Sequence, residues 1–456
     1  MHKTLANWLS YLESLHPKTI ALGLERVDQV WQRLNLSPNF PIITVGGTNG
    51  KGSVCAMLES TLHAAGYKVG CYTSPHLLAY NERVRIAKKP ASDPVLCASF
   101  EKIEEARKGQ RLDGRSSKLA ENSSFSRFRG NDDPLEIPLT YFEFGTLAAM
   151  LLFIEKQVEV AILEVGLGGR LDAVNIFDSD CAAVTSVDMD HMDYLGDTRE
   201  KIAFEKAGVF RAGKVAVFGD RDMPAAIASE VQRIGARLWR LGGEFDHELP
   251  QGAGGLERGQ WNYRGPGGAR TALPYPALRG AYQLNNASTV LAVLDALKDK
   301  LPVSMDAVRR GLTEVSLSGR FQVLPGKPTM ILDVAHNPHA ARALAGNLAA
   351  MPPGGRTFAV FSMLRDKDIA GVVRTLDGQV DAWMVAGINA PRGLAATQLA
   401  QLLNAEKVKG IVRTFDTVAD ALAQACNEAA ENDRIAVFGS FHTVAEAMHA
   451  RGLRQV

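Results

Sequence analysis

The feature of this sequence that most constrains its fold is an alternation of short apolar runs with longer segments of helical periodicity. One helical segment covers residues 53–65 and is followed by Gly66, a typical residue after a helix C-terminus. Strands that alternate with helices are typical of a mostly parallel sheet with helices on both faces. We therefore predict an α/β fold. The apolar runs expected to form strands are residues 42–45, 68–72, 158–165, 181–187, 214–218, 329–334, 356–361, 381–386, 410–415 and 434–439.

The chain length and one break in this pattern indicate the domain organisation. The 456 residues are enough for two or three domains. The stretch 315–328 has the character of a linker and of the entry into a second domain, so we predict a domain over residues 1–314 and a smaller one over residues 315–456. We expect short antiparallel strands in the Gly- and Pro-rich stretch 240–279. Residues 109–136 are polar and lack periodicity, so we interpret them as a mobile surface insertion.

Composition excludes several classes of partner. The net charge of +1 gives no overall basic field for nucleic acid or an anionic membrane. No apolar run is long enough to span a membrane, and the N-terminus lacks the apolar core of a signal peptide. The five cysteines are dispersed, which favours reduced thiols. We therefore expect a cytoplasmic protein that binds neither nucleic acid nor membrane.

A glycine-rich loop follows the first apolar run, in the stretch "ITVGGTNGKGSV" at residues 43–54. Four glycines surround Lys51, as in a loop that holds phosphate oxygens with backbone N–H groups and a helix N-terminus. The spacing departs from G-x-x-x-x-G-K-[ST], because Val45 replaces the first glycine and Gly52 follows the lysine. Ser53 could bind phosphate or help to hold Mg²⁺. The loop alone indicates phosphate and does not name a reaction.

Polar residues also follow the next apolar runs, where ligands bind in open α/β sheets. Glu164 ends an apolar strand, and a carboxylate there is costly unless it is paired or bound to metal. His191 follows another run, between Asp190 and Asp193, and Lys206 comes later beside Glu205. Each residue alone could be a cap, a surface histidine or a solvated lysine. Together, beside the phosphate loop, they indicate a metal–nucleotide site.

The second half supplies a comparable set of residues. Asp333 and His336 follow one apolar run, Ser440 and His442 follow another, and Arg320 lies in the linker. Arginine is well suited to binding phosphate oxygens. Because each half ends its strands in polar groups, we expect the active site in the cleft between the domains. Closure of that cleft would exclude water from a reactive intermediate.

Taken in order, the motifs resemble the bifunctional dihydrofolate synthase/folylpolyglutamate synthase family, the folate branch of the Mur ligase superfamily. The resemblance covers nearly the whole chain, and residues 109–136 are its main departure. It implies a P-loop ATPase domain followed by a Rossmann-like domain. The motifs are "GGTNGKGS" (46–53), "TSPHL" (73–77), "NERV" (81–84), "LTYFEF" (139–144), "LEVGLGGRLDAVN" (163–175), "DMDH" (188–191), "EKAG" (205–208), "SGR" (318–320), "DVAHNPHA" (333–340) and "GSFHTV" (439–444).

The resemblance implies ATP-dependent amide ligation. A pterin carboxylate attacks the γ-phosphate of ATP to give an acyl phosphate, and the amino group of L-glutamate then displaces phosphate. The implied substrates are dihydropteroate, reduced folates, L-glutamate and ATP. The implied cofactor is Mg²⁺ at two or more sites, and a monovalent cation is a further candidate. We expect a monomer. Two anions must meet in this reaction, so cations and backbone dipoles have to screen them.

Residue roles follow from the resemblance, position by position. Lys51, Glu164, His191 and Lys206 would be catalytic, and Lys206 matches a lysine that is carbamylated in the family. A carbamate is an anion, which suits a metal-rich site. The remaining implied sets are ATP-binding Gly47, Asn49, Gly50, Lys51, Gly52, Ser53, Asn286, Arg320 and Asp333; metal-binding Ser74, Glu164 and His191; pterin-binding Thr140, Phe142, Asp172 and Ala173; and glutamate-binding Arg83, His336 and Ser440.

There are four alternatives to this assignment. "LTYFEF" and Asp172–Ala173 resemble the pterin site of bifunctional relatives, so we predict both activities, although some relatives only extend folates. Phe142 could equally be a core aromatic. A cell-wall Mur ligase usually has a separate domain before its phosphate loop, and the loop here begins by residue 47. A P-loop regulatory switch would not need Asp333, His336 and Ser440.

Overall fold

The computed structural model of the protein describes residues 4–18, 20–109, 136–249, 259–280, 282–352, 354–390 and 392–453. The insertion predicted over residues 109–136 lies outside the described residues, except for its two end residues. No helix in the described ranges is long and apolar enough to cross a membrane.

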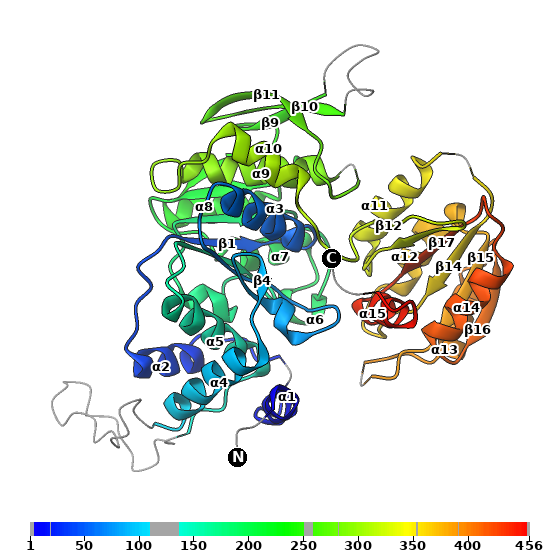
Figure 1. The fold of residues 1–456 in the computed structure, drawn as a ribbon, viewed down its shortest axis with the longest axis horizontal. Coiled ribbons are helices and arrows are strands. Elements are labelled where there is room, and N and C mark those ends of the chain that lie inside the picture. Colours follow the sequence, from blue (N-terminus) through cyan, green and yellow to red (C-terminus); the bar gives the residue numbers. More distant parts are fainter. Residues whose placement is uncertain are drawn as a thin grey trace.

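A mostly parallel sheet in the N-terminal part confirms the predicted α/β fold, and the expected strand runs are found there (Figure 1). Its order is β4-β3-β2-β5-β1-β6-β7-β8, parallel from β2 to β8 and antiparallel where β3 pairs with β2 and β4. The strands are β1 (Ile42–Gly46), β2 (Val69–Tyr72), β3 (Val84–Ile86), β4 (Lys89–Pro90), β5 (Val160–Glu164), β6 (Cys181–Val184), β7 (Val215–Phe218) and β8 (Arg237–Arg240).

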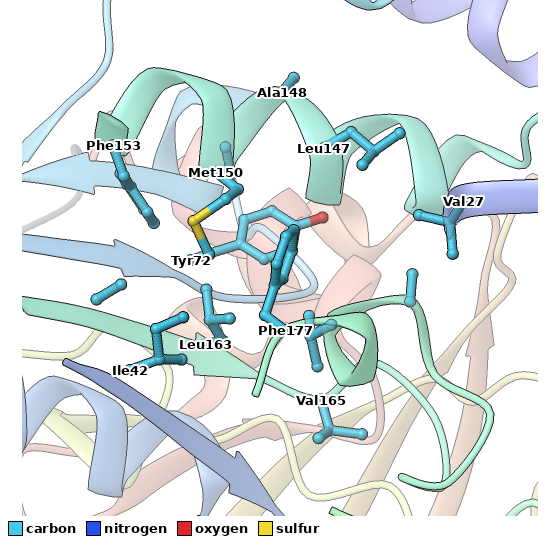
Figure 2. Close-up of a cluster of buried hydrophobic side chains, with 14 of the residues drawn as sticks. Val27, Ile42, Tyr72, Leu147, Ala148, Met150, Phe153, Leu163, Val165 and Phe177 are labelled. Atoms are coloured by element: carbon cyan, nitrogen blue, oxygen red, sulfur yellow. The ribbon is translucent and has the colours of Figure 1, made fainter. Parts of the chain in front are cut away.

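Helices cover both faces of this sheet, and each face has its own core. Figure 2 shows one core, in which α5 (Tyr141–Glu155) packs Leu147, Met150 and Phe153 over strand residues such as Leu163. The other helices on this face are α1 (Leu5–Ser14), α2 (Glu25–Leu34), α4 (Asp93–Arg107), α7 (Arg199–Ala207) and α8 (Ala225–Ile234), while α3 (Lys51–Ala64), α9 (Tyr282–Ala296) and α10 (Met305–Thr313) pack on the opposite face.

The Gly- and Pro-rich stretch forms short antiparallel strands, as predicted. They are β9 (Asp246–Glu248), β10 (Gln260–Gly265) and β11 (Gly268–Pro274), in the order β11-β10-β9. Their buried side chains, among them Trp261 and Tyr263, belong to the same core as those of α9. Short helical turns also occur at α6 (Met192–Leu195), η1 (Tyr80–Arg83), η3 (Ala173–Ile176) and η4 (Asp377–Gln379).

The C-terminal part contains a second mostly parallel sheet, drawn in yellow to red in Figure 1. Its order is β12-β13-β17-β14-β15-β16, with only the β12–β13 pairing antiparallel among the described strands. The strands are β12 (Gln322–Leu324), β13 (Thr329–Leu332), β14 (Thr357–Phe361), β15 (Ala382–Ala386), β16 (Ile411–Phe415) and β17 (Arg434–Phe438). One face packs α11 (Pro338–Ala349), α12 (Ile369–Leu376) and α13 (Ala396–Ala405), and the other α14 (Val418–Glu428) and α15 (Phe441–Ala450).

One expectation about local structure was wrong, and one strand was not expected. The stretch 315–328, expected to be a linker and the entry into the second domain, contains the edge strand β12. The strand expected over residues 181–187 ends at Val184. Beyond it the hydroxyls of Thr185 and Ser186 bind the glycine-rich loop instead of continuing a strand ladder. The domain boundary at residues 314/315 stays a prediction.

Candidate active site

The side chains predicted to act chemically line a single cleft with a cavity of about 700 Å³, a volume in the usual range for small-molecule sites. Its walls come from the carboxyl ends of strands in both sheets. The predicted residues that line it are Gly47, Asn49, Gly50, Lys51, Gly52, Ser53, Ser74, Arg83, Thr140, Phe142, Glu164, Asp172, Ala173, His191, Lys206, Asn286, Arg320, Asp333, His336 and Ser440.

The glycine-rich loop joins β1 directly to α3 and leaves the helix N-terminus free to bind an anion. Gly50, the N-cap residue, has a φ of 89° and provides no side-chain cap. The Lys51 ammonium folds back over the loop and donates to the carbonyls of Gly47 at 3.0 Å and Thr48 at 3.2 Å. An anion at the helix N-terminus could therefore recruit this cation from weaker, neutral acceptors.

The end of β6 holds this loop in shape. Thr185 Oγ1 donates to the Asn49 carbonyl at 2.6 Å, and Ser186 Oγ accepts from the Asn49 backbone N–H at 3.2 Å. Gly47 has a φ of 138°, and a Cβ there would lie 2.0 Å from Thr185 Oγ1. Only glycine fits at that point, which lets the loop pack closely against Thr185.

Glu164 ends β5 beneath the loop, with 4% of its surface exposed. Its Oε2 accepts the Ser74 backbone N–H at 3.1 Å. Burial raises the pKa of Glu164, although Lys51 opposes this shift. Arg320 of the C-terminal part reaches the same point: a Cβ on Gly52 would lie 3.6 Å from Arg320 Nη2 and 3.9 Å from Glu164 Oε1. The two halves of the chain therefore meet at the start of α3.

His191 and Lys206 complete the loop's surroundings. His191 precedes α6 in a left-handed conformation with a φ of 52°. Burial lowers its pKa to about 4, against the opposing effect of Asp190, so the ring is neutral near pH 7 and one of its nitrogens carries a lone pair. Lys206 on α7 is 5% exposed and donates to the Gly47 carbonyl at 3.0 Å. Burial, with Lys51 adding to it, lowers its pKa to about 7.

The predicted pterin residues line the cleft, but two of them also have local structural roles. Thr140 caps α5 in a reciprocal capping box with Glu143. The Asp172 carboxylate accepts the backbone N–H groups of Leu167 at 2.8 Å and Val174 at 3.1 Å, and burial raises its pKa to about 7. Phe142 fits both of its interpretations, since it lines the cleft and also packs closely over the main chain of Gly166, beside the Tyr72 ring.

On the C-terminal side, the carboxylate of Asp333 accepts the backbone N–H groups of Phe321 and Ala335, each at 2.8 Å. It therefore fixes the main chain that carries Arg320. Ser440 caps α15 by accepting the Thr443 N–H at 3.0 Å. Both side chains therefore have a structural role. The predicted contacts of Asp333 with ATP and of Ser440 with glutamate stay predictions.

Three other predicted residues lie as follows. His336 Nδ1 is 2.8 Å from the Val334 carbonyl, and burial lowers the pKa of His336 to about 4. Arg83 donates from Nε to His76 Nδ1 at 2.9 Å, and its guanidinium lies over the Tyr80 and Tyr141 rings. The amide oxygen of Asn286 faces the loop, 2.7 Å from the position that a Cβ on Gly50 would take.

Sequence reasoning missed several residues of the cleft. Residues 20–23, between α1 and α2, line it beside the predicted pterin residues. Lys367, in the loop after β14, lines it opposite His191. The rule that ligands bind beyond strand ends would have found Lys367, because it follows an apolar run. Residues 20–23 have no such signal, since they are a largely apolar link between two helices.

The comparisons with known proteins identify the domains and the relatives of the chain. Residues 119–294 match the Mur ligase middle domain, and residues 319–441 match the Mur ligase glutamate ligase domain. A dihydrofolate synthase/folylpolyglutamate synthase of Escherichia coli is 45% identical over 452 residues, covering 99% of this chain and 96% of that protein.

Solved structures match over the same extent. The structure of "E.coli FolC in complex with DHPP and ADP" has a TM-score of 0.86 and 45% identity, and covers 99% of this chain and 98% of its own. A bifunctional folylpolyglutamate synthase/dihydrofolate synthase with Mn, AMPPNP and L-glutamate bound has a TM-score of 0.84 and 46% identity, with 99% and 98% coverage.

Proposed function

The chain belongs to the dihydrofolate synthase/folylpolyglutamate synthase family, the members of which are ATP-dependent ligases, and on this premise we propose how its cleft carries out both reactions. It joins L-glutamate to dihydropteroate and adds further glutamates to reduced folates. The observation that carries this proposal is a single cleft lined by the phosphate loop of one half and by Arg320, His336 and Ser440 of the other. A nucleotide and an amino acid bound to the two halves would meet there.

ATP would bind with its phosphates on the glycine-rich loop. The uncapped N-terminus of α3 faces the β- and γ-phosphates, and Lys51 moves from the loop carbonyls to a phosphate oxygen. Arg320 approaches the same helix end from the other half, where a guanidinium can bind two phosphate oxygens at once. Asn286 lies beside the loop, and Asp333 holds the segment that carries Arg320.

The residues beside the loop fit a divalent cation such as Mg²⁺. Glu164 is a buried carboxylate next to Ser74, and Mg²⁺ binds one or two carboxylates together with substrate phosphates. Within the described ranges no three His, Cys, Asp or Glu side chains form a metal cluster. Phosphate oxygens and water would therefore complete a site at Ser74 and Glu164 and a second at Glu164 and His191. When bound, such an ion neutralises charge on the γ-phosphate.

Lys206 is suited to carbamylation. Burial and the neighbouring Lys51 lower the pKa of Lys206 to about 7, so about half of its amines are neutral at that pH. A neutral amine can attack carbon dioxide, forming an N–C bond and releasing one proton. The product is an anion next to the cationic Lys51 and the metal-binding residues, where a free ammonium would be repelled.

The ligation then needs two displacements. A carboxylate oxygen of the pterin substrate attacks the γ-phosphorus, the bond to the bridging oxygen breaks, and ADP leaves. The amino nitrogen of L-glutamate, after losing a proton, attacks the acyl carbon, and phosphate leaves with the C–O bonding electrons. Arg83, His336 and Ser440 would orient the glutamate, and Thr140, Phe142, Asp172 and Ala173 the pterin. A cleft that encloses both substrates keeps water from the acyl phosphate.

The experiment that tests this function is phosphate release from ATP with dihydropteroate and L-glutamate, followed by mass spectrometry of the product. We expect dihydrofolate, and a reduced folate lengthened by glutamate when folate replaces dihydropteroate. Product from folate alone would support the alternative of folate extension only. Turnover only with a UDP-muramoyl peptide would indicate a cell-wall ligase, and no substrate-stimulated turnover would overturn the proposal. A monomeric state and a monovalent cation remain predictions.

A further inference from the structure

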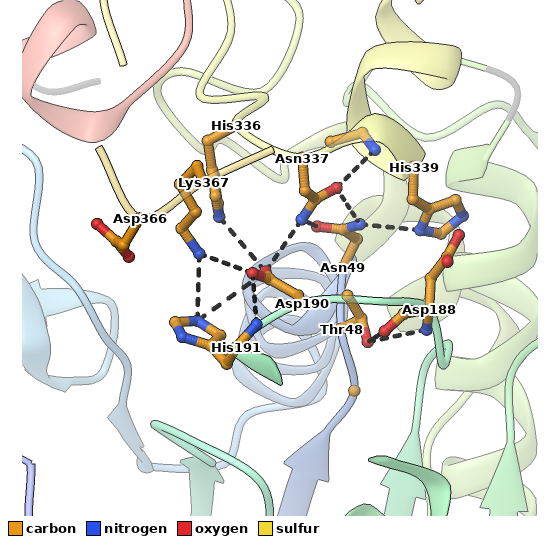
Figure 3. Close-up of polar contacts among 12 residues, drawn as sticks. Thr48, Asn49, Asp188, Asp190, His191, His336, Asn337, His339, Asp366 and Lys367 are labelled. Carbon is orange, nitrogen blue, oxygen red and sulfur yellow. Dashed lines mark hydrogen bonds and ion pairs between the residues drawn. The ribbon is translucent and has the colours of Figure 1, made fainter. Parts of the chain in front are cut away.

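A group of polar side chains joins the two halves of the chain at the mouth of the phosphate loop (Figure 3). Its centre is Asp190, in the loop between β6 and α6. Asp190 Oδ1 lies 2.7 Å from the ammonium of Lys367, and Oδ2 accepts the Asn337 side-chain amide at 3.1 Å. Lys367 and Asn337 both belong to the C-terminal part, in the loops that follow β14 and β13. One carboxylate of the N-terminal part therefore binds two loops of the C-terminal part.

The ion pair between Asp190 and Lys367 is shielded from water. The two side chains are only 10% and 8% exposed. An ion pair of this kind is costly to break from one side, because the remaining charge loses its partner without regaining water.

A neighbouring contact ties the same group to the phosphate loop. Asn49 of the loop and Asn337 exchange side-chain amide hydrogen bonds at 3.1 and 3.2 Å. Asn337 also caps α11, so this helix is coupled to the loop. On the other side, the Lys367 ammonium lies 3.5 Å from His191 Nε2. The contacts around Asp190 therefore connect the loop, His191 and the C-terminal part.

A second ion pair between the halves provides an internal comparison. Arg342 Nη2 lies 2.6 Å from Asp188 Oδ2, but the two side chains are 53% and 27% exposed. Solvent screens a pair like this, and such pairs contribute little. Both pairs begin in the loop between β6 and α6, but Arg342 lies on α11 and Lys367 lies in the loop after β14. The Asp188–Arg342 pair is much more exposed than the Asp190–Lys367 pair.

We propose that Asp190 and Lys367 are a positioning pair that seats the C-terminal part against the phosphate loop, so that the glutamate-binding side chains reach the acyl phosphate. Neither residue needs to touch a substrate in this role. The expected effect on kinetics rests on the proposed function. The expected effect on structure, a separation of the two halves when the pair is broken, is independent of the proposed function.

The test is a double-mutant cycle with Asp190→Asn, Lys367→Met and the double variant, and Arg342→Gln serves as the matched control. We expect each single variant to lower kcat/KM for L-glutamate at least about tenfold, because a buried pair is broken. The double variant should lose no more than about twofold beyond the worse single one, since both changes break the same contact. Losses that multiply would show that the two residues act separately and would overturn the proposal.

Small-angle X-ray scattering of the ligand-free proteins gives a second readout, which needs no activity. The radius of gyration should increase in the Asp190 and Lys367 variants and stay unchanged in Arg342→Gln. Unchanged scattering in all variants would overturn the proposal. Lys367→Arg keeps the charge, so it should have the scattering and the kcat/KM of the wild-type protein. This variant also keeps the test valid if Lys367→Met fails to fold. A Lys367→Arg protein as inactive and as expanded as Lys367→Met would contradict a positioning role. An inactive wild-type protein would count against the proposed function. The scattering would still test whether Asp190 and Lys367 hold the two halves together.

Discussion

Replacing Lys206 by methionine tests the idea that this site stores a costly buried charge. Methionine has nearly the length of lysine and no charge. The Gly47 carbonyl, which accepts from Lys206, also accepts from Lys51 at 3.0 Å, so the substitution leaves it with a donor. We therefore expect Lys206→Met to abolish ligation and to stabilise the folded protein. This is the usual direction where an active site holds a residue in an unfavourable state.

The magnitude follows from the pKa of Lys206, which falls from 10.5 to about 7 on folding. One pKa unit corresponds to about 1.4 kcal/mol, so the protonated folded state carries a cost of about 5 kcal/mol at low pH. Between pH 7 and 10.5 the unfolded chain binds this proton and the folded protein does not, so stability rises with pH. The advantage of the variant should be about 4 kcal/mol at pH 7 and about 2 kcal/mol at pH 9.

The assay is urea unfolding of wild type and variant at both pH values, in buffer depleted of carbon dioxide so that the free amine is present. The signal should come from the N-terminal part, since two domains need not unfold together. Lys201→Met is the matched control, because Lys201 lies on the same helix with a side chain 63% exposed; it should show little change at either pH. The reasoning would be refuted if Lys206→Met had a lower free energy of unfolding than wild type. It would also be refuted if the gain in free energy of unfolding were the same at pH 7 and pH 9.

Three further predictions concern activity. Lys51→Ala should lower kcat by about 10²-fold or more in steady-state phosphate release, because the transferred phosphoryl group loses its nearest cation; near-normal kcat would contradict its role. Lys206→Ala should regain part of its activity when short carboxylates are added, since these can replace the carbamate anion, as titration with formate or acetate would show. Asp172→Ala should impair the reaction of dihydropteroate more than the extension of reduced folates, and equal losses in parallel assays would remove a pterin-specific role.

Much of the fold could be predicted from the sequence because its parallel strands are buried on both faces. Strands β1, β5 and β17 are apolar runs, and each was expected within two residues of its bounds. The edge strand β8 was missed, because its sequence "RLWR" is charged at both ends and its outer residues are exposed. Strand β12 was missed for a related reason: it is a short edge strand with half-buried side chains, whose pairing to β13 gives no local signal.

The candidate site was predictable where function depends on strand ends, and less so where it depends on packing between domains. Glu164 ends β5 and His191 follows β6, the two strands on either side of β1, and Lys206 lies on α7, which follows His191 in the chain. The topology of the sheet therefore brings the ends of β5 and β6 to the glycine-rich loop. Lys367 could have been found by the same rule. Its pairing with Asp190 could not, because a contact between residues 177 positions apart depends on how two separately folded halves meet.

The early end of β6 has a consequence for anyone who would move this phosphate loop into another protein. Residues 46–53 are not a self-contained unit, because Thr185 and Ser186 provide the hydrogen bonds that give the loop its shape. A graft of the glycine-rich segment alone would collapse or stay open. A working transplant has to carry two strand ends that are adjacent in space and about 140 residues apart in the chain.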